Sequence, residues 1–200
     1  MCARSRSSRL ARLHRLGNGV RVICDPIAGF ETLALSVVIG RGARWEHKAQ
    51  SGWSHLLEHM VFKGAGGRSA MDIVEAIESE GGQLNAATGY ERTSFQVRAL
   101  KGGLALALEV VADLVFRPVL ESGELAREKG VIAQEIAEAA DTPDDLVFDL
   151  AQAAVFGDQP LAFDVPEDGG VWDSLYLVGP SPSPDEWPPR PLPGRPRGRT

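Results

Sequence analysis

The 200-residue chain has only two cysteines, Cys2 and Cys24. So few thiols exclude the disulfide framework of small secreted domains, and a reducing compartment is expected. No apolar run is long enough to span a bilayer. The net charge of −6 argues against a general nucleic-acid binder. Hydrophobic residues still make up 44% of the chain, enough for the core of one ordinary domain.

Acidic residues are absent before Asp25, whereas the first sixteen residues hold five arginines. This composition is typical of a mitochondrial transit peptide, although a frayed basic terminus or a start codon set too early would look the same. We treat residues 1–12 as a basic N-terminal extension. We expect a bacterial cytoplasmic protein, with the mitochondrial matrix as the alternative.

The last part of the chain changes in composition. Residues 179–200 contain eight of the thirteen prolines and almost no apolar periodicity, which is typical of disorder. We therefore divide the chain into the extension, a domain at 13–161, and a tail at 162–200 rich in Pro, Gly and Arg.

Strands and helices mix along the central domain without strict alternation, which predicts an α+β fold with helices packed on a sheet. Asn18-Gly19 indicates a tight hairpin. Ser51 is the expected N-cap of a helix that runs to about Lys63, and Ser69 with Asp72 forms a capping box for the next helix. Strands are predicted at 20–24, 33–39, 83–88 and 93–100, and further helices at 104–116, 122–139 and 143–156.

The sequence His55-Leu56-Leu57-Glu58-His59 is an H-x-x-E-H motif. Residues i and i+4 lie on one face of a helix, so His55 and His59 can bind the same zinc ion. Glu58 is then close enough to act on a water molecule. The pattern inverts the H-E-x-x-H signature of zinc peptidases. The alternative is a polar helix face that holds two histidines by chance.

A catalytic zinc usually has three protein ligands and an open position. Glu128 and Glu135 lie two turns apart on one face of the predicted helix at 122–139, on the same side as the apolar Leu125, Val131, Ile132 and Ile136. Carboxylates on an apolar face need a compensating charge, which a metal ion provides. Alternatively, both glutamates are exposed.

These segments resemble the family of pitrilysin, insulinase and mitochondrial processing peptidase, the inverzincins. Glu135 follows His59 by 76 residues, which is the family's spacing to its third zinc ligand. The resemblance covers about residues 13–161. It extends to the signature helix at 52–64, the opening strand at 16–22, and the segments Gly42-Ala43-Arg44-Trp45-Glu46, Asn85-Ala86-Ala87-Thr88 and Glu91-Arg92-Thr93.

The resemblance implies an N-terminal zinc metalloendopeptidase domain that binds one Zn²⁺ per chain and hydrolyses peptides or presequences. His55, His59 and Glu135 would be the ligands, and Glu58 would be the general base. Glu128 would hold a ligand histidine in place or stabilise the charge of the site, without binding the zinc itself. Asn85 and Ala86 would contact a peptide bound as an added strand.

The chain departs from the family in length. A full family subunit is about twice as long, and its second half closes over the first. From about Ala162 onward the sequence no longer resembles the family, which suggests a frameshift or a truncated gene model. The alternative is a natural short variant with a disordered tail. We therefore expect weak or no peptidase activity from this chain alone, because the site lacks its closing half. A second family subunit or a homodimer would be the partner that supplies it.

Two other functions compete with the peptidase. A non-catalytic subunit that binds peptides or supports a catalytic partner usually loses the zinc residues, and all of them are present here. A structural zinc domain would need a closed site, commonly with cysteines. Cys2 and Cys24 are both distant from the motif in the sequence.

Overall fold

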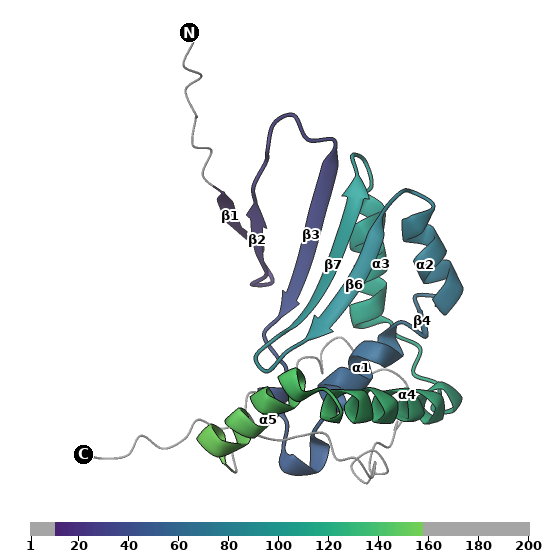
Figure 1. Cartoon of the computed structure of the whole chain (residues 1–200). Coiled ribbons are helices and arrows are strands. Elements are labelled where there is room, and N and C mark those ends of the chain that lie inside the picture. Colours follow the sequence, from purple (N-terminus) through teal and green to yellow (C-terminus); the bar gives the residue numbers. More distant parts are fainter. Residues whose placement is uncertain (1–10, 158–200) are drawn as a thin grey trace, which may run out of the picture.

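The computed structural model describes residues 11–157 (Figure 1). The predicted tail at 162–200, and all but the end of the basic extension, lie outside the described residues. The fold is a three-stranded antiparallel sheet with helices packed against it, so the predicted α+β class is confirmed. None of the helices within residues 11–157 has the length and apolarity needed to cross a membrane.

The sheet has the strand order β3-β7-β6, where β3 is Thr32–Ile39, β6 is Gln83–Thr88 and β7 is Thr93–Leu100. Alternate residues of β3 point in opposite directions, so Leu33, Leu35, Val37 and Ile39 face the core while the residues between them are exposed. The hairpin predicted at Asn18-Gly19 joins β1 (Arg12–Arg15) to β2 (Arg21–Cys24) in a separate two-stranded sheet.

Two helices cover one face of the sheet, α2 (Ala70–Glu78) and α3 (Leu104–Phe116). Their side chains and those of the middle strand β7 form the core, which contains Ile73, Ile77, Phe95, Val97, Val110, Val111 and Leu114. The predicted capping box at the start of α2 is confirmed, because the Asp72 backbone N–H donates to Ser69 Oγ while the Asp72 carboxylate accepts from the Ser69 N–H.

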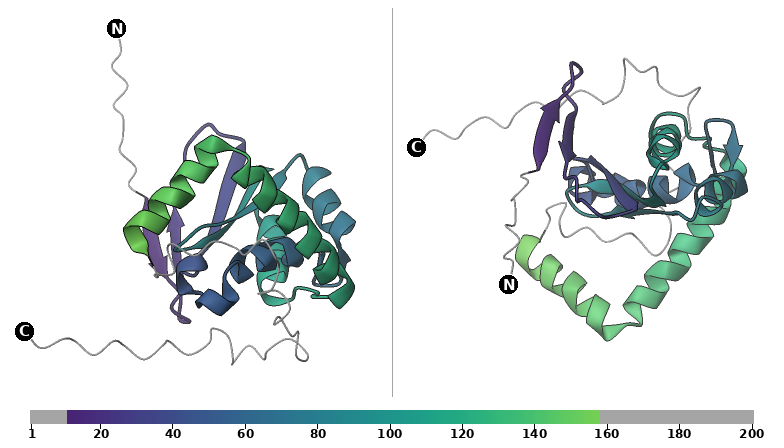
Figure 2. Two further views of the ribbon diagram at one scale, coloured as in Figure 1. Left: turned by 60° about the horizontal axis from the view of Figure 1, so that its bottom comes forward. Right: turned by 90° about the horizontal axis from the view of Figure 1, so that it is seen from above.

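The remaining helices lie at one end of the sheet. Helix α1 (Trp53–Val61) contacts both β6 and α4 (Ser122–Ala140), and α5 (Pro143–Phe156) continues from α4. Seen along the sheet, α4 and α5 extend away on the side opposite α2 and α3 (Figure 2).

A short segment between α1 and α2 was not predicted as strand. Here β4 (Gly64–Ala65) pairs with β5 (Arg68–Ser69). The Val119 backbone N–H also donates to the Gly64 carbonyl oxygen over 2.7 Å, and Ala65 forms a bridge with Pro118. The end of α1 is thereby fixed to the chain that leads into α4.

Candidate metal centre

Helix α1 begins at Trp53, and its N-cap is Gly52 rather than the predicted Ser51. Gly52 has φ 86°, which a residue with a side chain rarely adopts. The buried Glu46 carboxylate caps the helix instead: it accepts hydrogen bonds from the backbone N–H groups of Gly52 and Ser54, each over 2.7 Å. A carboxylate from outside the helix therefore satisfies its first amides.

The apolar face of α1 does not include every apolar residue of the helix. Leu56, Met60 and Val61 are buried and Trp53 packs beside them, but Leu57 is exposed. The side chains of Leu56 and Met60 meet Leu125 and Ile132 of α4. This contact holds the two helices side by side and brings their polar side chains together.

His55 and His59 lie one turn apart on α1, as the i and i+4 spacing predicts. Their Nε2 atoms are 3.1 Å apart, and their rings meet edge to face. Burial is the largest cause that holds the pKa of His55 below its usual value, and the neighbouring His59 adds to this shift. The low pKa favours the neutral imidazole, which is the form that binds metal ions.

Glu135 of α4 completes a group of three donors. Its Oε2 atom lies 3.5 Å from His55 Nε2 and 3.6 Å from His59 Nε2. A tetrahedral zinc ion with bonds of about 2.1 Å would separate its ligands by about 3.4 Å. The three separations therefore match those expected between zinc ligands. Among the residues at 11–157, His55, His59 and Glu135 are a group of donors that could hold a metal ion.

The three donors leave one side of the centre open. The side chains of His55 and Glu135 are 37% and 45% exposed, whereas the side chain of His59 is 19% exposed. A structural zinc site is normally closed by four protein ligands, while a catalytic one keeps a position for water or substrate. The open geometry favours chemistry over a purely structural role.

Glu128 lies behind His59, between α1 and α4. Its Oε2 atom is 3.0 Å from His59 Nδ1, and its Oε1 atom is 2.6 Å from Lys63 Nζ. Burial raises the pKa of Glu128, but the hydrogen bonds from Lys63 and His59 outweigh this effect and leave the pKa below its usual value. An ionised carboxylate only accepts hydrogen bonds, so Nδ1 of His59 is the donor in this contact. In a neutral His59 ring, Nε2 would then have the lone pair that a metal ion needs.

The predicted apolar stripe of α4 is correct except at one position. Leu125, Glu128 and Ile132 are buried and Ile136 packs beside them, but Val131 is 43% exposed. Of the two predicted glutamates, only Glu128 is buried, and Glu135 lies at the margin of the stripe.

Glu58 is half-buried on α1, one residue before His59, and its charge acts on His55. The Glu58 carboxylate therefore lies on the same helix as the two candidate ligands His55 and His59, but it is not part of the three-donor group.

The predicted substrate residues lie on β6, which is an edge strand of the sheet within the described residues. Asn85 points to the uncovered face, whereas Ala86 packs against the core. The C-terminal end of β6 approaches the metal centre, because Thr88 Oγ1 lies 3.4 Å from the Ser54 carbonyl oxygen of α1. Because its side chain packs against the core, Ala86 can offer a ligand only its backbone.

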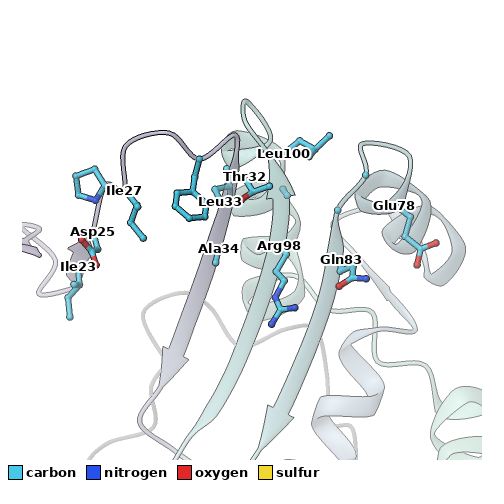
Figure 3. Close-up of a pocket in the computed structure, with 15 residues that line it drawn as sticks. Ile23, Asp25, Ile27, Thr32, Leu33, Ala34, Glu78, Gln83, Arg98 and Leu100 are labelled. Carbon is cyan, nitrogen blue, oxygen red and sulfur yellow. The ribbon is translucent and has the colours of Figure 1, made fainter. Parts of the chain in front are cut away.

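A hollow of about 1150 Å³ lies at the end of the sheet opposite the candidate metal centre (Figure 3). Ile23, Ile27, Leu100 and Arg98 are among the residues around it. None of its described lining residues is a histidine or a cysteine. The hollow therefore lacks the donor set found between α1 and α4.

Sequence reasoning did not assign a role to Glu46 or Lys63. Both lie within the family-like segments, but neither forms a motif with the histidines. Glu46 contacts the helix that it caps, and Lys63 contacts Glu128, only once the chain has folded. These contacts could not be inferred from the sequence.

The sequence of this chain is similar to those of known zinc proteases. The profile described as Insulinase (Peptidase family M16) matches residues 22–167. An uncharacterized zinc protease of Rickettsia bellii is 40% identical over 147 residues, covering 74% of this chain and 36% of the relative. An uncharacterized zinc protease of Bacillus subtilis is 38% identical over 148 residues, with the same two coverages. The chain thus spans about a third of the length of the curated relatives it matches.

Solved structures share the fold at lower identity. A protease from Helicobacter pylori superposes with a TM-score of 0.74 at 24% identity, covering 84% of this chain and 41% of that one. Pitrilysin gives a TM-score of 0.70 at 23% identity, with coverages of 84% and 18%. A peptidase M16 inactive domain from Pseudomonas fluorescens gives 0.69 at 18%, with coverages of 77% and 38%. Because one neighbour is an inactive domain, the fold alone does not determine activity.

Proposed function

This chain belongs to peptidase family M16, the insulinase family, and from that premise we propose that it is the metal-binding part of a zinc metalloendopeptidase. Its ligands are His55, His59 and Glu135, with one Zn²⁺ per chain. Glu58 is the general base, and Glu128 orients His59. The substrates are peptides or presequences in an extended conformation.

The observation that carries the proposal is the convergence of three donor atoms from two helices at separations of 3.1 to 3.6 Å. A bound zinc ion would supply Lewis-acid chemistry, polarising a peptide carbonyl and making a water molecule more acidic. Glu58 takes the proton from the attacking water and delivers it to the leaving amine. The carboxylate of Glu128 keeps the proton of His59 on Nδ1.

The substrate would bind along the free edge of β6. A peptide in extended conformation pairs its backbone with an edge strand, and its alternate side chains then face the sheet surface. Asn85 meets the substrate with its side chain, and Ala86 meets it with its backbone. The link between Thr88 and Ser54 supports this arrangement, because it holds the end of β6 against α1.

On its own the chain should be a poor catalyst. The side chains of His55 and Glu135 are considerably exposed to solvent, so water screens the charges that would stabilise the transition state. A second family subunit or a second copy of the chain would be needed to enclose the site. The alternative function is a non-catalytic subunit of a two-subunit peptidase, which the likeness to an inactive domain keeps open.

The test is zinc stoichiometry of the purified chain combined with matched variants. Wild type should bind close to one zinc ion per chain, and Glu135→Gln should lose it. Glu138→Gln removes the same charge from an exposed position on the same helix and should keep the metal. A wild-type chain without zinc, or a Glu135→Gln variant that retains it, would contradict the assignment.

Glu58→Gln separates catalysis from metal binding. This variant should retain the zinc of the wild type and lose whatever cleavage of a fluorogenic peptide the chain shows, alone or with an added M16 partner subunit. If wild type with its zinc cleaves no peptide even when such a partner is present, the non-catalytic alternative is preferred.

A further inference from the structure

Lys63 is a charged residue with no assigned role, and it lies directly beside the metal centre. It follows the last turn of α1, four residues after His59. Its side chain is 30% exposed and its Nζ lies 2.6 Å from Glu128 Oε1, whereas the Glu128 side chain is only 7% exposed. The cation therefore pairs with a carboxylate that water hardly reaches.

The two oxygens of Glu128 have separate partners. Lys63 Nζ forms an ion pair with Oε1, and His59 Nδ1 lies within hydrogen-bond distance of Oε2, at 3.0 Å. Rotation of the carboxylate about its last torsion would break both contacts at once. The pairing with Lys63 therefore fixes the plane of the carboxylate, and the plane of the carboxylate fixes the His59 ring.

The backbone of Lys63 is itself held in place. Its N–H donates to the Met60 carbonyl oxygen over 3.1 Å, and the next residue, Gly64, accepts from the Val119 N–H over 2.7 Å. Gly64 and Ala65 are both buried. The backbone that carries the Lys63 side chain is thus held in place at the junction of α1, β4 and the segment before α4.

We propose that Lys63 is a positioning residue of the metal centre: by anchoring Glu128, it holds His59 with Nε2 directed at the metal. The inference rests on the proposed function, because it concerns the same ligands. Lys63 touches neither metal nor substrate, and it acts through Glu128. Outer partners of metal ligands typically contribute 10- to 100-fold to metal affinity, and Lys63 would act in the same way at one remove.

The test uses the full chain and two readouts. The first is the zinc dissociation constant from chelator competition. The second is the ¹⁵N resonances of the His59 ring in the metal-free protein, which report the nitrogen that carries the proton. The variants are Lys63→Met and Lys63→Arg. Lys101→Met is the control, because Lys101 and its partner Glu31 are both largely exposed and on another part of the molecule.

Lys63→Met should weaken zinc binding roughly tenfold or more. It should also change His59 from a single Nδ1–H tautomer to a mixture, because the carboxylate is no longer held against the ring. Lys63→Arg keeps a cation at this place and should restore both readouts, and Lys101→Met should leave both unchanged. A folded Lys63→Met variant with wild-type zinc affinity and a wild-type His59 tautomer would overturn the proposal.

A double variant covers the case in which Lys63→Met does not fold. Adding Glu128→Gln removes the buried charge that would otherwise lack its partner. If Lys63 acts through Glu128, the double variant binds zinc as Glu128→Gln alone does. A further loss of affinity in the double variant would show that Lys63 acts elsewhere and would overturn the proposal.

The two proposals fail in different ways. If the wild-type chain binds no zinc, the proposed function fails. The His59 tautomer in metal-free wild type and Lys63→Met then still decides whether Lys63 positions the ring.

Discussion

Asp113 is a charged side chain almost completely enclosed by the protein. It lies on α3, is 2% exposed, and pairs with Arg68 and Arg117. Gly66, at φ +60°, is in close contact with it: a Cβ at Gly66 would lie 2.0 Å from Asp113 Oδ2. The two arginines prevent the carboxylate from moving aside, so this glycine is required for steric reasons as well as for its backbone conformation.

We predict that Gly66→Ala destabilises the chain far more than Gly67→Ala. Gly67 has φ +87°, but a Cβ there would meet no atom within 4 Å, so its substitution isolates the backbone cost of about 1–2 kcal/mol. Gly66→Ala adds overpacking, which contributes a further 1–3 kcal/mol or so. Urea unfolding of the metal-free variants measures both. Equal losses would mean that Asp113 is not held as tightly as its ion pairs indicate.

His55 makes stability depend on pH in the metal-free chain. Its folded pKa lies below the usual 6.5, so the unfolded chain binds this proton more readily. The contribution of neutral His55 is complete above pH 6.5 and is lost as the pH falls through the lower folded pKa. Thermal melts should show this loss in wild type and in His47→Gln, which changes an exposed histidine. The loss should shrink in His55→Gln, and an unchanged pH profile there would contradict the prediction.

Among single residues, the grouping of the candidate metal ligands was predictable to the extent that they share a helix. The spacing of His55 and His59, and of Glu128 and Glu135, follows helical periodicity, and the structure brings three of these four side chains into one donor group with the fourth behind His59. Glu46 and Lys63 could not be assigned, because their partners are set by tertiary contacts.

At the scale of elements, the N-terminus of α1 depends on a residue that the helix does not contain. Glu46 satisfies two backbone amides of the turn that carries His55. We predict that Glu46→Gln lowers the free energy of unfolding by about 1–3 kcal/mol, because a charged, buried acceptor is replaced by an amide. Zinc affinity should fall as well, since the first turn carries the proposed ligand His55.

The control for this prediction is Glu91→Gln. Glu91 pairs with Arg44 on the surface and should contribute little to stability. If Glu46→Gln unfolds at the same urea concentration as Glu91→Gln, a solvent molecule caps α1 as well as the carboxylate does.

The sequence predicted elements best where local signals were strong. The strands at 83–88 and 93–100 and the helix at 104–116 have the predicted bounds, since alternation, flanking glycines and length agree. The start of α1 was wrong, because Ser51 is a good local cap but Glu46 supplies a better acceptor from a distance. The predicted apolar stripe of α4 was wrong at Val131, which lies at the margin of the buried face.

At the scale of the whole molecule, α5 contributes little to the core. It packs chiefly on α4, and Val147, Phe148, Leu150 and Val155 are exposed. We predict that Ala151→Pro in α5 leaves most of the unfolding free energy and the zinc affinity intact, because the helix opens locally. Ala112→Pro in α3 should unfold the chain, since proline inside a core helix costs about 3 kcal/mol or more.

Hydrogen exchange gives an independent measurement of the same difference. The amides of α5 should exchange through local opening, and those of α3 only through global unfolding. Equal protection of the two helices would show that α5 belongs to the cooperative unit.

Two of the three sheet strands, β6 and β7, and both helices that cover the sheet lie between α1 and α4 in the chain, and Glu135 follows His59 by 76 residues. During synthesis, both histidines emerge long before the third donor, by roughly 4–15 s at ordinary elongation rates of 5–20 residues per second. The nascent chain therefore carries two of the three proposed donors until α4 docks on α1. If the chain binds zinc as proposed, loading with metal would be a late event in biogenesis and would mark a chain whose core has already formed.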